Sequence, residues 1–270
     1  MLRLTILGCG TSSGVPRIGN DWGACDPADA RNRRTRASIL VESGTTRILV
    51  DTGPDMRAQL LAVGTGHVDA VLWTHDHADH CHGIDDLRQI AQNSRSVVRA
   101  YARRETLDLL RRRFAYAFEG RSGYPPIIDG QVLPEGRLSI GDIAIEAVDQ
   151  PHGEIFSTGF RFTHDGKSIG YSTDFHEVTP EMIAFFAGVD IWVADALRER
   201  PHPTHAHLAL TLEAIAAVAP ARAYLTHMDT SMDYAALSAR LPQGVEPAHD
   251  GLVVVLDGEE TGWRETGGNE

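Results

Sequence analysis

The residues best suited to chemistry lie in one short run of the chain. Positions 74–80 read THDHADH and follow the apolar residues 70–73, which predict a β-strand. Imidazole and carboxylate groups are ligands for zinc, manganese or iron, and a strand end holds its side chains rigidly. The run therefore predicts a metal site at the end of a strand. Four side chains of ligand type fall within six residues there: His75, His77, Asp79 and His80.

The spacing within this run excludes the helical zinc site in which two histidines share one face. His75 and His77 are two residues apart, so on an α-helix their side chains would diverge by about 200°. In a turn that leaves a strand, both imidazoles can converge on one ion while Asp79 and His80 face another. The alternative interpretation is a polar turn that happens to be rich in histidine, but the density of ligand side chains favours metal binding.

Three further residues of ligand type occur downstream, each at the end of a strand-like segment. Taken singly, each would be an ordinary polar residue, either solvated or satisfied in the core. Their shared position indicates joint coordination with the THDHADH run, in two adjacent sites of mixed nitrogen and oxygen character. His152, Asp174 and His227 follow the segments 143–148, 167–172 and 222–226, respectively.

Hydrophobic periodicity assigns these residues to a mixed α/β chain. Strands are predicted at 2–7, 37–42, 46–51, 69–74, 97–101, 143–148, 157–162, 167–172, 189–194, 222–226 and 252–256. Helices are predicted at 55–63, 84–93, 103–118, 179–187, 207–218 and 232–240. The connection at 42–45 is too short for a crossover helix, so part of the sheet is antiparallel. We expect a single domain over 1–258 and a frayed polar tail over 259–270.

The composition limits the functions that this chemistry can serve. The 270 residues are 42% hydrophobic and 23% charged, which fits a globular protein and excludes intrinsic disorder. A formal net charge of −12 weighs against a broad nucleic-acid surface, which needs a basic face. Three dispersed cysteines, Cys9, Cys25 and Cys81, form neither a disulfide framework nor a CxxC zinc motif.

The sequence also predicts a cytoplasmic protein without a membrane partner. No apolar run approaches the ~20 residues that span a bilayer. The N-terminal residues MLRLTILGCG contain too short an apolar stretch for a signal peptide. Their alternation of apolar and polar residues fits a first β-strand instead.

The HxHxDH run with later His, Asp and His residues resembles the metallo-β-lactamase superfamily. The resemblance implies an αββα sandwich, in which two mixed sheets are flanked by helices. It also implies two divalent metal ions per chain, zinc or manganese. By this resemblance His75, His77 and His152 bind one ion, Asp79, His80 and His227 bind the other, and Asp174 bridges them.

Asp51, in the segment LVDTG, matches the early aspartate of the superfamily. The resemblance implies that this residue orients a metal ligand, which fixes the tautomer and basicity of that ligand. The alternative is an aspartate that only stabilises a turn at a strand end.

Within the superfamily, the segment GCGTSSGVP at 8–16 resembles the phosphodiesterase branch. That branch holds the tRNA 3′-processing endonucleases and the phosphoribosyl cyclic phosphate phosphodiesterases. The resemblance implies hydrolysis of a small phosphodiester, a cyclic ribose phosphate or a nucleotide-like ester, by attack of a metal-bound hydroxide. Asp79 and His205 are the expected catalytic residues, because His205 matches the general acid that protonates the leaving oxygen. Asp195 is expected to orient His205, and homodimers are common in the branch.

Two departures separate this chain from its branch. Some cyclic phosphodiesterases hold a structural zinc with three early cysteines and a late histidine, whereas the loop at 19–26 offers only Cys25. That zinc site is therefore expected to be absent. The tRNA enzymes use a protruding basic arm rich in glycine and proline, and the sequence offers no clear counterpart. The expected partner is thus a small phosphorylated substrate, and nucleic acid is disfavoured.

A basic segment at 103–121, interleaved with aromatic residues, has two interpretations. It is either a solvated helix face with its aromatic residues packed inward, or a lid over the metals that holds a phosphorylated ribose or a base. The lid hypothesis makes Arg113 and Tyr124 candidate substrate contacts. His207 is a third candidate, and it equally suits the start of a helix. His249 is either a pocket residue or part of a surface loop.

Three other functions remain open from the sequence. A hydrolase of the glyoxalase II or lactonase type would share the metals but attack a carbonyl carbon. A tRNA 3′-processing endonuclease would share the metals and bind precursor tRNA in a strongly salt-dependent manner. A metal-binding scaffold or sensor would hold the ions without turnover.

Overall fold

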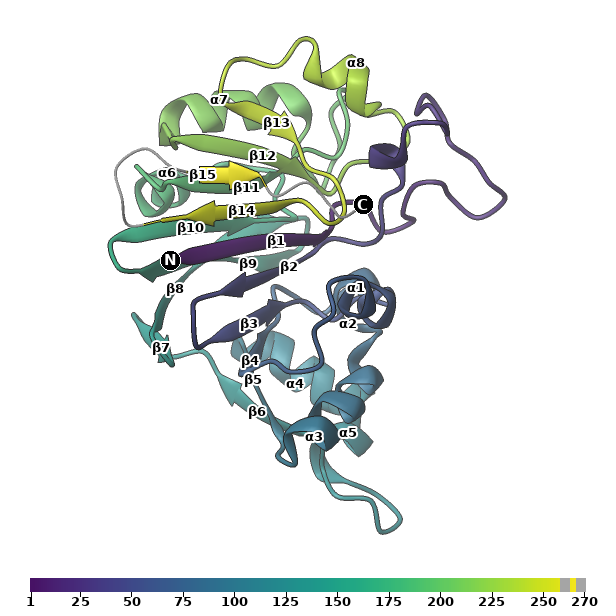
Figure 1. Cartoon of the computed structure of the whole chain (residues 1–270), viewed down its shortest axis with the longest axis vertical. Helices are drawn as coiled ribbons and strands as arrows, with labels where there is room; N and C mark the ends of the chain where they lie inside the picture. Colours follow the sequence, from purple (N-terminus) through teal and green to yellow (C-terminus); the bar gives the residue numbers. More distant parts are fainter. Residues whose placement is uncertain (258–262, 266–270) are drawn as a thin grey trace.

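The computed structural model describes residues 1–257 and 263–265, which form two β-sheets (Figure 1). The larger sheet runs in the order β15 (Trp263–Glu265), β14 (Val253–Leu256), β1 (Leu2–Gly8), β2 (Ser38–Glu42), β3 (Arg47–Val50), β4 (Ala70–Leu72), β5 (Val98–Ala102), β6 (Ile128–Val132). The smaller sheet runs in the order β13 (Val245–Pro247), β12 (Arg222–Thr226), β11 (Ile191–Asp195), β10 (Lys167–Ser172), β9 (Ile155–His164), β8 (Ile143–His152), β7 (Leu138–Ile140).

The main hydrophobic core lies between the two sheets. Alternate residues of β1, namely Leu2, Leu4 and Ile6, are fully buried in one cluster with Phe160 and Phe162 of β9. Because side chains alternate across a strand, the same spacing that predicted β1 also determines which of its faces enters this core.

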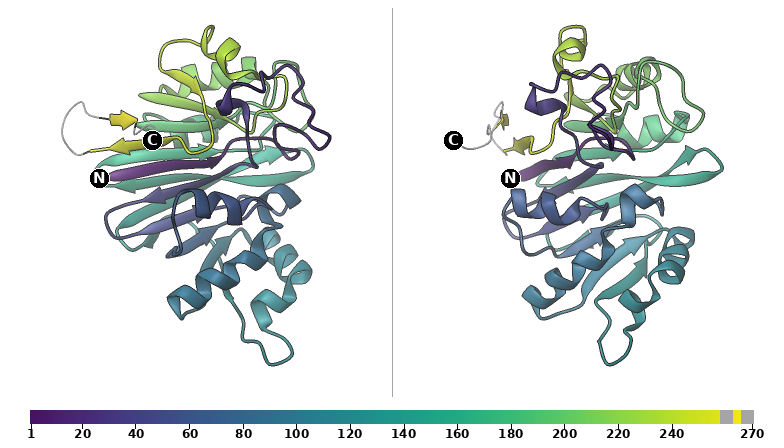
Figure 2. Two further views of the ribbon diagram at one scale, coloured as in Figure 1. Left: turned by 45° about the vertical axis from the view of Figure 1, so that its right-hand side comes forward. Right: turned by 90° about the vertical axis from the view of Figure 1, so that its right-hand side faces the viewer.

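Helices cover the outer face of each sheet, as Figure 2 shows. The larger sheet is covered by α1 (Met56–Ala62), α3 (Leu87–Ser94), α4 (Arg104–Arg113) and α5 (Ala115–Glu119), with the short α2 (Ala78–Cys81) and a 3₁₀ turn at Ile84–Asp86 beside them. The smaller sheet carries α6 (Pro180–Phe186), α7 (Leu208–Val218) and α8 (Tyr234–Ser238). The predicted αββα sandwich is confirmed.

The predicted strands and α-helices correspond closely to the observed ones, with five omissions among the described residues. The sequence did not predict the single-turn helix α2 or the strands β6, β7, β13 and β15. The predicted helix at 103–118 is interrupted at Phe114, whose backbone is not helical and separates α4 from α5. The antiparallel connection at 42–45 is confirmed by the pairing of β2 with β3.

The end of the chain is described only in part. Residues 263–265 of the expected polar tail form β15, which pairs antiparallel with β14. The remaining residues of 259–270 lie outside the described part of the chain, and the single domain over 1–258 stays a prediction. Within the described residues, no helix combines the length and the apolar character that crossing a bilayer would need.

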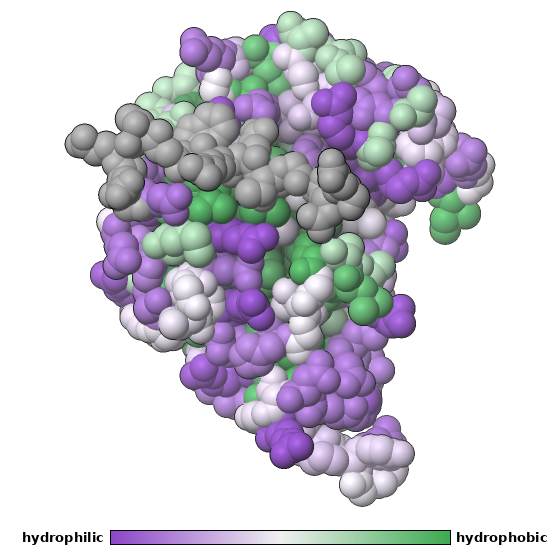
Figure 3. All heavy atoms as spheres, viewed as in Figure 1, coloured by the Kyte–Doolittle hydropathy of each residue, from purple (hydrophilic) through white to green (hydrophobic). Residues whose placement is uncertain are grey.

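The connection between β1 and β2 includes a 3₁₀ turn at Ala30–Asn32 and projects from the body of the molecule (Figure 1). Figure 3 shows hydrophobic atoms at its far end, and Ile18 in this connection is fully exposed. Its base is held by the buried Arg34, which donates hydrogen bonds to the carbonyl of Met232 at 2.6 Å and to Oδ1 of Asn32 at 3.3 Å. Cys25 lies beside this guanidinium, with its Sγ 3.9 Å from Arg34.

Strand direction brings the predicted site together at one edge of the sandwich. The strands β3, β4 and β5 are mutually parallel, as are β10, β11 and β12. β8 pairs antiparallel with β9, which pairs antiparallel with β10, so β8 ends at the same edge as β10. Carboxyl ends of neighbouring parallel strands are the usual place for a ligand site in such sheets.

Candidate metal centre

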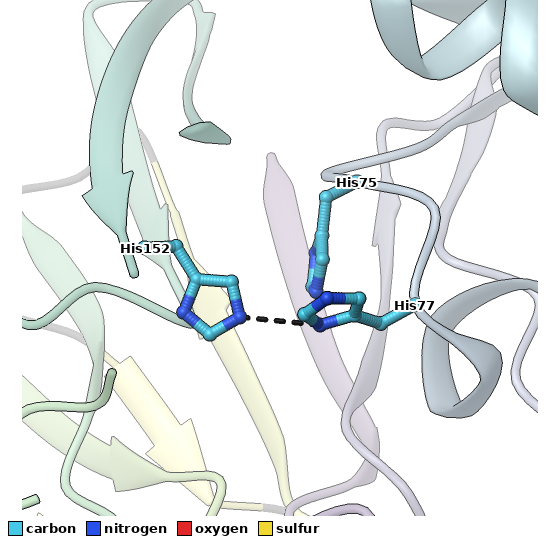
Figure 4. Close-up of side chains that lie close together, drawn as sticks. All are labelled: His75, His77 and His152. Carbon is cyan, nitrogen blue, oxygen red and sulfur yellow. Dashed lines mark hydrogen bonds between the residues drawn. The ribbon is translucent and has the colours of Figure 1, made fainter. Parts of the chain in front are cut away.

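Histidine and aspartate side chains from both sheets converge at this edge. The loop after β4 contributes His75 and His77, and β8 ends in His152 (Figure 4). Nε2 of His152 lies 3.2 Å from Nδ1 of His77, and the ring centroids of His75 and His77 are 4.5 Å apart. One nitrogen from each of the three rings lies within 4.8 Å of the others. This spacing matches three ligands that share one cation.

A second group adjoins the first through a buried carboxylate. Nε2 of His80 and Nε2 of His227 each lie 3.4 Å from Oδ2 of Asp79. Asp174, which follows β10, lies between the two groups: its Oδ2 is 3.2 Å from His80, and its Oδ1 is 3.6 Å from His227 and 3.7 Å from His152. One carboxylate therefore contacts both groups.

Hydrogen bonds behind the cluster fix the orientation of two rings. Oδ2 of Asp51 lies 2.7 Å from Nδ1 of His80, and both side chains are fully buried. Thr74 donates from its backbone nitrogen and its hydroxyl to Asp51, at 2.8 Å each. Nδ1 of His152 lies 2.7 Å from the carbonyl oxygen of Thr204, which accepts its proton. In both rings Nδ1 is thus engaged, and Nε2 is the nitrogen turned toward the cluster, as a metal ligand needs.

A third group surrounds His205, which lies in the loop before α7. Its Nδ1 lies 3.1 Å from Oδ2 of Asp195 and 3.6 Å from Oδ1 of Asp174. The rings of His205 and His227 stack with centroids 4.8 Å apart, and Asp195 Oδ1 lies 3.9 Å from Nδ1 of His227. His205 retains 14% exposure, whereas Asp195 is fully buried. A carboxylate behind a partly exposed imidazole is a suitable arrangement for proton transfer.

The backbone is strained where these residues leave their strands. Asp51, Asp174 and His227 have φ values of 65°, 58° and 59°, in the left-handed region that L residues seldom adopt. Such strain costs on the order of 1–3 kcal/mol per residue and is concentrated at functional sites. Gly53 permits a further close approach, since a Cβ there would lie 2.3 Å from the carbonyl oxygen of Asp79.

Burial and charge shift the pKa values of these groups in opposite directions. Burial lowers the pKa of His75 well below its ordinary value. Burial opposes protonation of His80 and His227 too, but nearby carboxylates, Asp174 foremost, raise the pKa of His80 well above normal and that of His227 to about 9. Although burial would raise them, the same imidazoles hold the pKa values of Asp79 and Asp174 well below normal. The buried carboxylates are therefore anionic, and the surrounding imidazoles stabilise their charge.

The donor set fits divalent metal ions. Nε2 of His75 and Nε2 of His80 are buried and have no hydrogen-bond partner among the described residues. Burying a polar atom without a partner is unfavourable, so an unpaired imidazole nitrogen beside anionic carboxylates indicates a cation. Mixed imidazole and carboxylate ligands suit zinc or manganese.

The three candidate substrate contacts occupy different parts of the structure. Arg113 donates to the carbonyl oxygen of Asp76 and forms a 2.6 Å ion pair with its carboxylate, so it braces the THDHADH loop. Tyr124, 70% exposed, belongs to the connection between α5 and β6, which projects at the lower end of Figure 1. It lines a surface depression with Arg88 and Arg121. His207 precedes α7 as its N-terminal cap residue.

Two further histidines lie outside the proposed ligand set, and the role of one of them, His202, was not predicted from the sequence. His202 is an ordinary turn histidine by sequence, yet its ring centroid lies 5.2 Å from that of His205. Its Nδ1 accepts from the backbone nitrogen of Thr204 at 3.3 Å. His249 contacts the ring of Tyr234, with centroids 6.0 Å apart. Neither Thr204 nor His202 carries a sequence signal, because one acts through its backbone and the other through a tertiary contact.

Comparisons with known proteins agree with this geometry. A family model described as the beta-lactamase superfamily domain matches residues 46–228. An octanoyltransferase of Porphyromonas gingivalis is 31% identical over 265 residues, which are 95% of this chain and 52% of that protein. A ribonuclease Z of Bradyrhizobium is 32% identical over 166 residues, which are 58% of this chain and 51% of that protein. The chain thus spans about half the length of these curated relatives.

A solved structure is similar over nearly the whole chain. It is described as a diphosphatase from the PhnP family, and it superposes with a TM-score of 0.85 at 33% sequence identity. The alignment covers 93% of this chain and 96% of that one.

Proposed function

Because the chain belongs to the metallo-β-lactamase superfamily, we propose that it is a metal-dependent phosphodiesterase that cleaves a small phosphodiester. The substrate class is a cyclic ribose phosphate or a nucleotide-like ester. The observation that carries the proposal is the position of His205, whose Nδ1 lies 3.1 Å from the buried Asp195 while the ring retains 14% exposure at the candidate metal centre. An alkoxide that leaves phosphorus needs a proton, whereas a thiolate that leaves a thioester does not.

The proposed centre holds two divalent ions, zinc or manganese. One ion would be held by His75, His77 and His152. The other would be held by Asp79, His80 and His227, and Asp174 would be a ligand of both. When bound, such ions supply a water activated near neutral pH and neutralise charge that develops on phosphorus. The contact of Asp174 with both groups, at 3.2 Å to His80 and 3.7 Å to His152, supports the pairing.

Asp79 and His205 have separate roles in the reaction. Asp79, which the adjacent imidazoles hold in its anionic form, would accept a hydrogen bond from the attacking water and direct the water oxygen to bond with phosphorus. The P–O bond to the leaving group then breaks while His205 gives a proton to that oxygen from Nε2, because its Nδ1 is engaged by Asp195. The Asp195 carboxylate stabilises the imidazolium that precedes this transfer.

Hydrolysis of two kinds of ester tests the proposal. Protein loaded with zinc or manganese is expected to cleave bis(p-nitrophenyl) phosphate. His205→Ala is expected to reduce cleavage of a phosphodiester with a poor alkyl leaving group by about 100-fold or more, because no group then protonates the departing alkoxide. His67→Ala, at an exposed histidine paired with Asp69, is the control. Loaded protein that cleaves a thioester and spares both phosphodiesters would indicate a carbonyl hydrolase instead.

A second candidate is hydrolysis of a substituted diphosphate, favoured by the similarity to the PhnP-family diphosphatase. The same residues would act, but the leaving group is then a phosphate, which departs without full protonation. His205→Ala would consequently affect diphosphate cleavage much less than alkyl phosphodiester cleavage. Comparing both substrates with the wild type and this variant separates the candidates.

A further inference from the structure

A groove of about 390 Å³ lies beside the loop that follows β4 and carries His75 and His77. One wall is formed by α4, including Thr106 and Leu109, and the other by the start of β9, with Ile155 and Phe156. Asp76, which lies between His75 and His77 in the chain, also lines it. The groove therefore shares a residue with the loop that carries His75 and His77, and it includes Ile155, which pairs with His152 across the hairpin.

The aromatic wall of this groove is rigid and uncovered. Phe156 is 65% exposed, which is unusual for so large an apolar side chain. Its backbone is fixed because β8 and β9 pair in register from Ala144 to the turn, where Pro151 lies opposite Phe156 and His152 lies opposite Ile155. An exposed ring on a rigid hairpin offers a stacking surface at little entropic cost.

The charge in the groove is negative. Asp149 is neutralised by Arg103 at 2.6 Å and Asp76 by Arg113 at 2.6 Å. Glu105 and Glu154 also line the groove, and neither has an ion-pair partner within residues 1–257. Two uncompensated carboxylates repel a second phosphate and accept hydrogen bonds from amino groups.

We propose that this groove binds a nucleobase with an exocyclic amino group, stacked on Phe156 with its amine donating to Glu105 or Glu154. This inference rests on the proposed function and deepens it. The phosphodiester at the centre would then be esterified to a nucleoside on the non-leaving side, and a second anionic group would be excluded. Base-to-aromatic stacking and carboxylate acceptance of an amino group are both established modes of base recognition.

Binding of adenosine, which carries no phosphate, tests the groove independently of hydrolysis. Adenosine is expected to bind the wild-type protein measurably by calorimetry, and Phe156→Ala is expected to weaken it at least fivefold. Leu61→Ala, at an apolar residue of α1 that is as exposed as Phe156 and lies outside the groove, is the matched control and should leave binding unchanged. Inosine, with an acceptor in place of the amine, should bind at least threefold more weakly. Glu105→Gln and Glu154→Gln together should remove that preference.

Kinetics then connect the groove to the reaction. The loaded enzyme is expected to cleave p-nitrophenyl adenosine 5′-phosphate with at least tenfold higher kcat/KM than methyl p-nitrophenyl phosphate. Phe156→Ala should abolish that ratio without lowering the rate on the methyl ester. Equal binding of adenosine and inosine, or adenosine binding that Phe156→Ala leaves unchanged, would overturn the inference. Absence of hydrolysis with intact adenosine binding would refute the proposed function alone.

Discussion

Oδ2 of Asp51 lies 2.7 Å from Nδ1 of His80, and both side chains are fully buried. The hydrogen bond directs the other nitrogen of His80 toward Asp79 and Asp174. It also links two strand ends, since Asp51 follows β3 and His80 lies in the helix that follows β4. Asp51 therefore links the end of β3 in the larger sheet to His80, a proposed metal ligand.

The first prediction concerns this contact. Asp51→Asn is expected to weaken metal binding by about 10–100-fold, because an amide neither orients the ring as strongly nor raises its basicity. Titration of the metal-free variant with zinc, followed by calorimetry, gives the affinity. Asp85→Asn, at an exposed carboxylate paired with Arg88 on the helical layer, serves as the control. Equal metal affinities in wild type and Asp51→Asn would show that Asp51 only stabilises the turn at the strand end.

Much of the cluster could be predicted from the sequence because its members are local to strand ends. His152, Asp174 and His227 each follow an apolar segment whose period identifies a strand. Strand order then determines that these ends meet, and parallel neighbours place them at one edge. The THDHADH run is dense enough to identify that edge without knowledge of the fold.

The contacts that could not be predicted depend on how the tertiary structure places a long side chain or a loop, or on a backbone atom. Arg113 is basic and near aromatic residues, which suggests a phosphate contact, but the position of α4 brings its guanidinium to Asp76. Tyr124 lies beyond the break at Phe114, and a periodicity argument cannot indicate the direction of a loop after a helix ends. The carbonyl of Thr204 orients His152, and a carbonyl carries no residue-specific signal.

The second prediction concerns metal removal. Treatment with a chelator is expected to lower Tm by about 5–10 °C for each ion removed, since an ion at 100-fold its Kd contributes about 2.7 kcal/mol and each kcal/mol shifts Tm by about 2–4 °C in a chain of this size. Readdition of zinc should restore Tm, and elemental analysis should give two ions per chain. His77→Ala should reduce both the shift and the stoichiometry, whereas His67→Ala should retain them. An unchanged Tm together with no bound metal would contradict the proposed centre.

The third prediction concerns the carboxylate behind the general acid. Asp195→Asn is expected to slow cleavage of an alkyl phosphodiester by about tenfold or more, because the imidazolium of His205 loses its stabilising charge. Cleavage of bis(p-nitrophenyl) phosphate, whose leaving group needs little protonation, should fall much less. The ratio of the two rates within one variant corrects for any loss of metal or folded protein. A uniform loss on both substrates would indicate that Asp195 acts only through His227.

The fourth prediction concerns stability and pH at a carboxylate away from the metal centre. Burial raises the pKa of Asp250 to about 6, although Thr35 and Cys9 donate hydrogen bonds to it. The native state therefore binds this proton more tightly than the unfolded state, whose value is about 3.9. The resulting stabilisation is complete below about pH 4 and is lost as the pH rises through about 6.

Asp250→Asn removes this titratable group, so the difference in unfolding free energy between wild type and variant isolates its contribution to the pH dependence. The free energy of unfolding of the wild type, measured relative to the variant with urea, is expected to fall by up to about 3 kcal/mol between pH 4 and pH 7. The asparagine also accepts hydrogen bonds from Thr35 and Cys9 less well than the carboxylate. That loss does not depend on pH, so it changes the difference in unfolding free energy by a constant amount. A difference that stays constant over this range would mean that the donated hydrogen bonds fully offset the burial of the carboxylate.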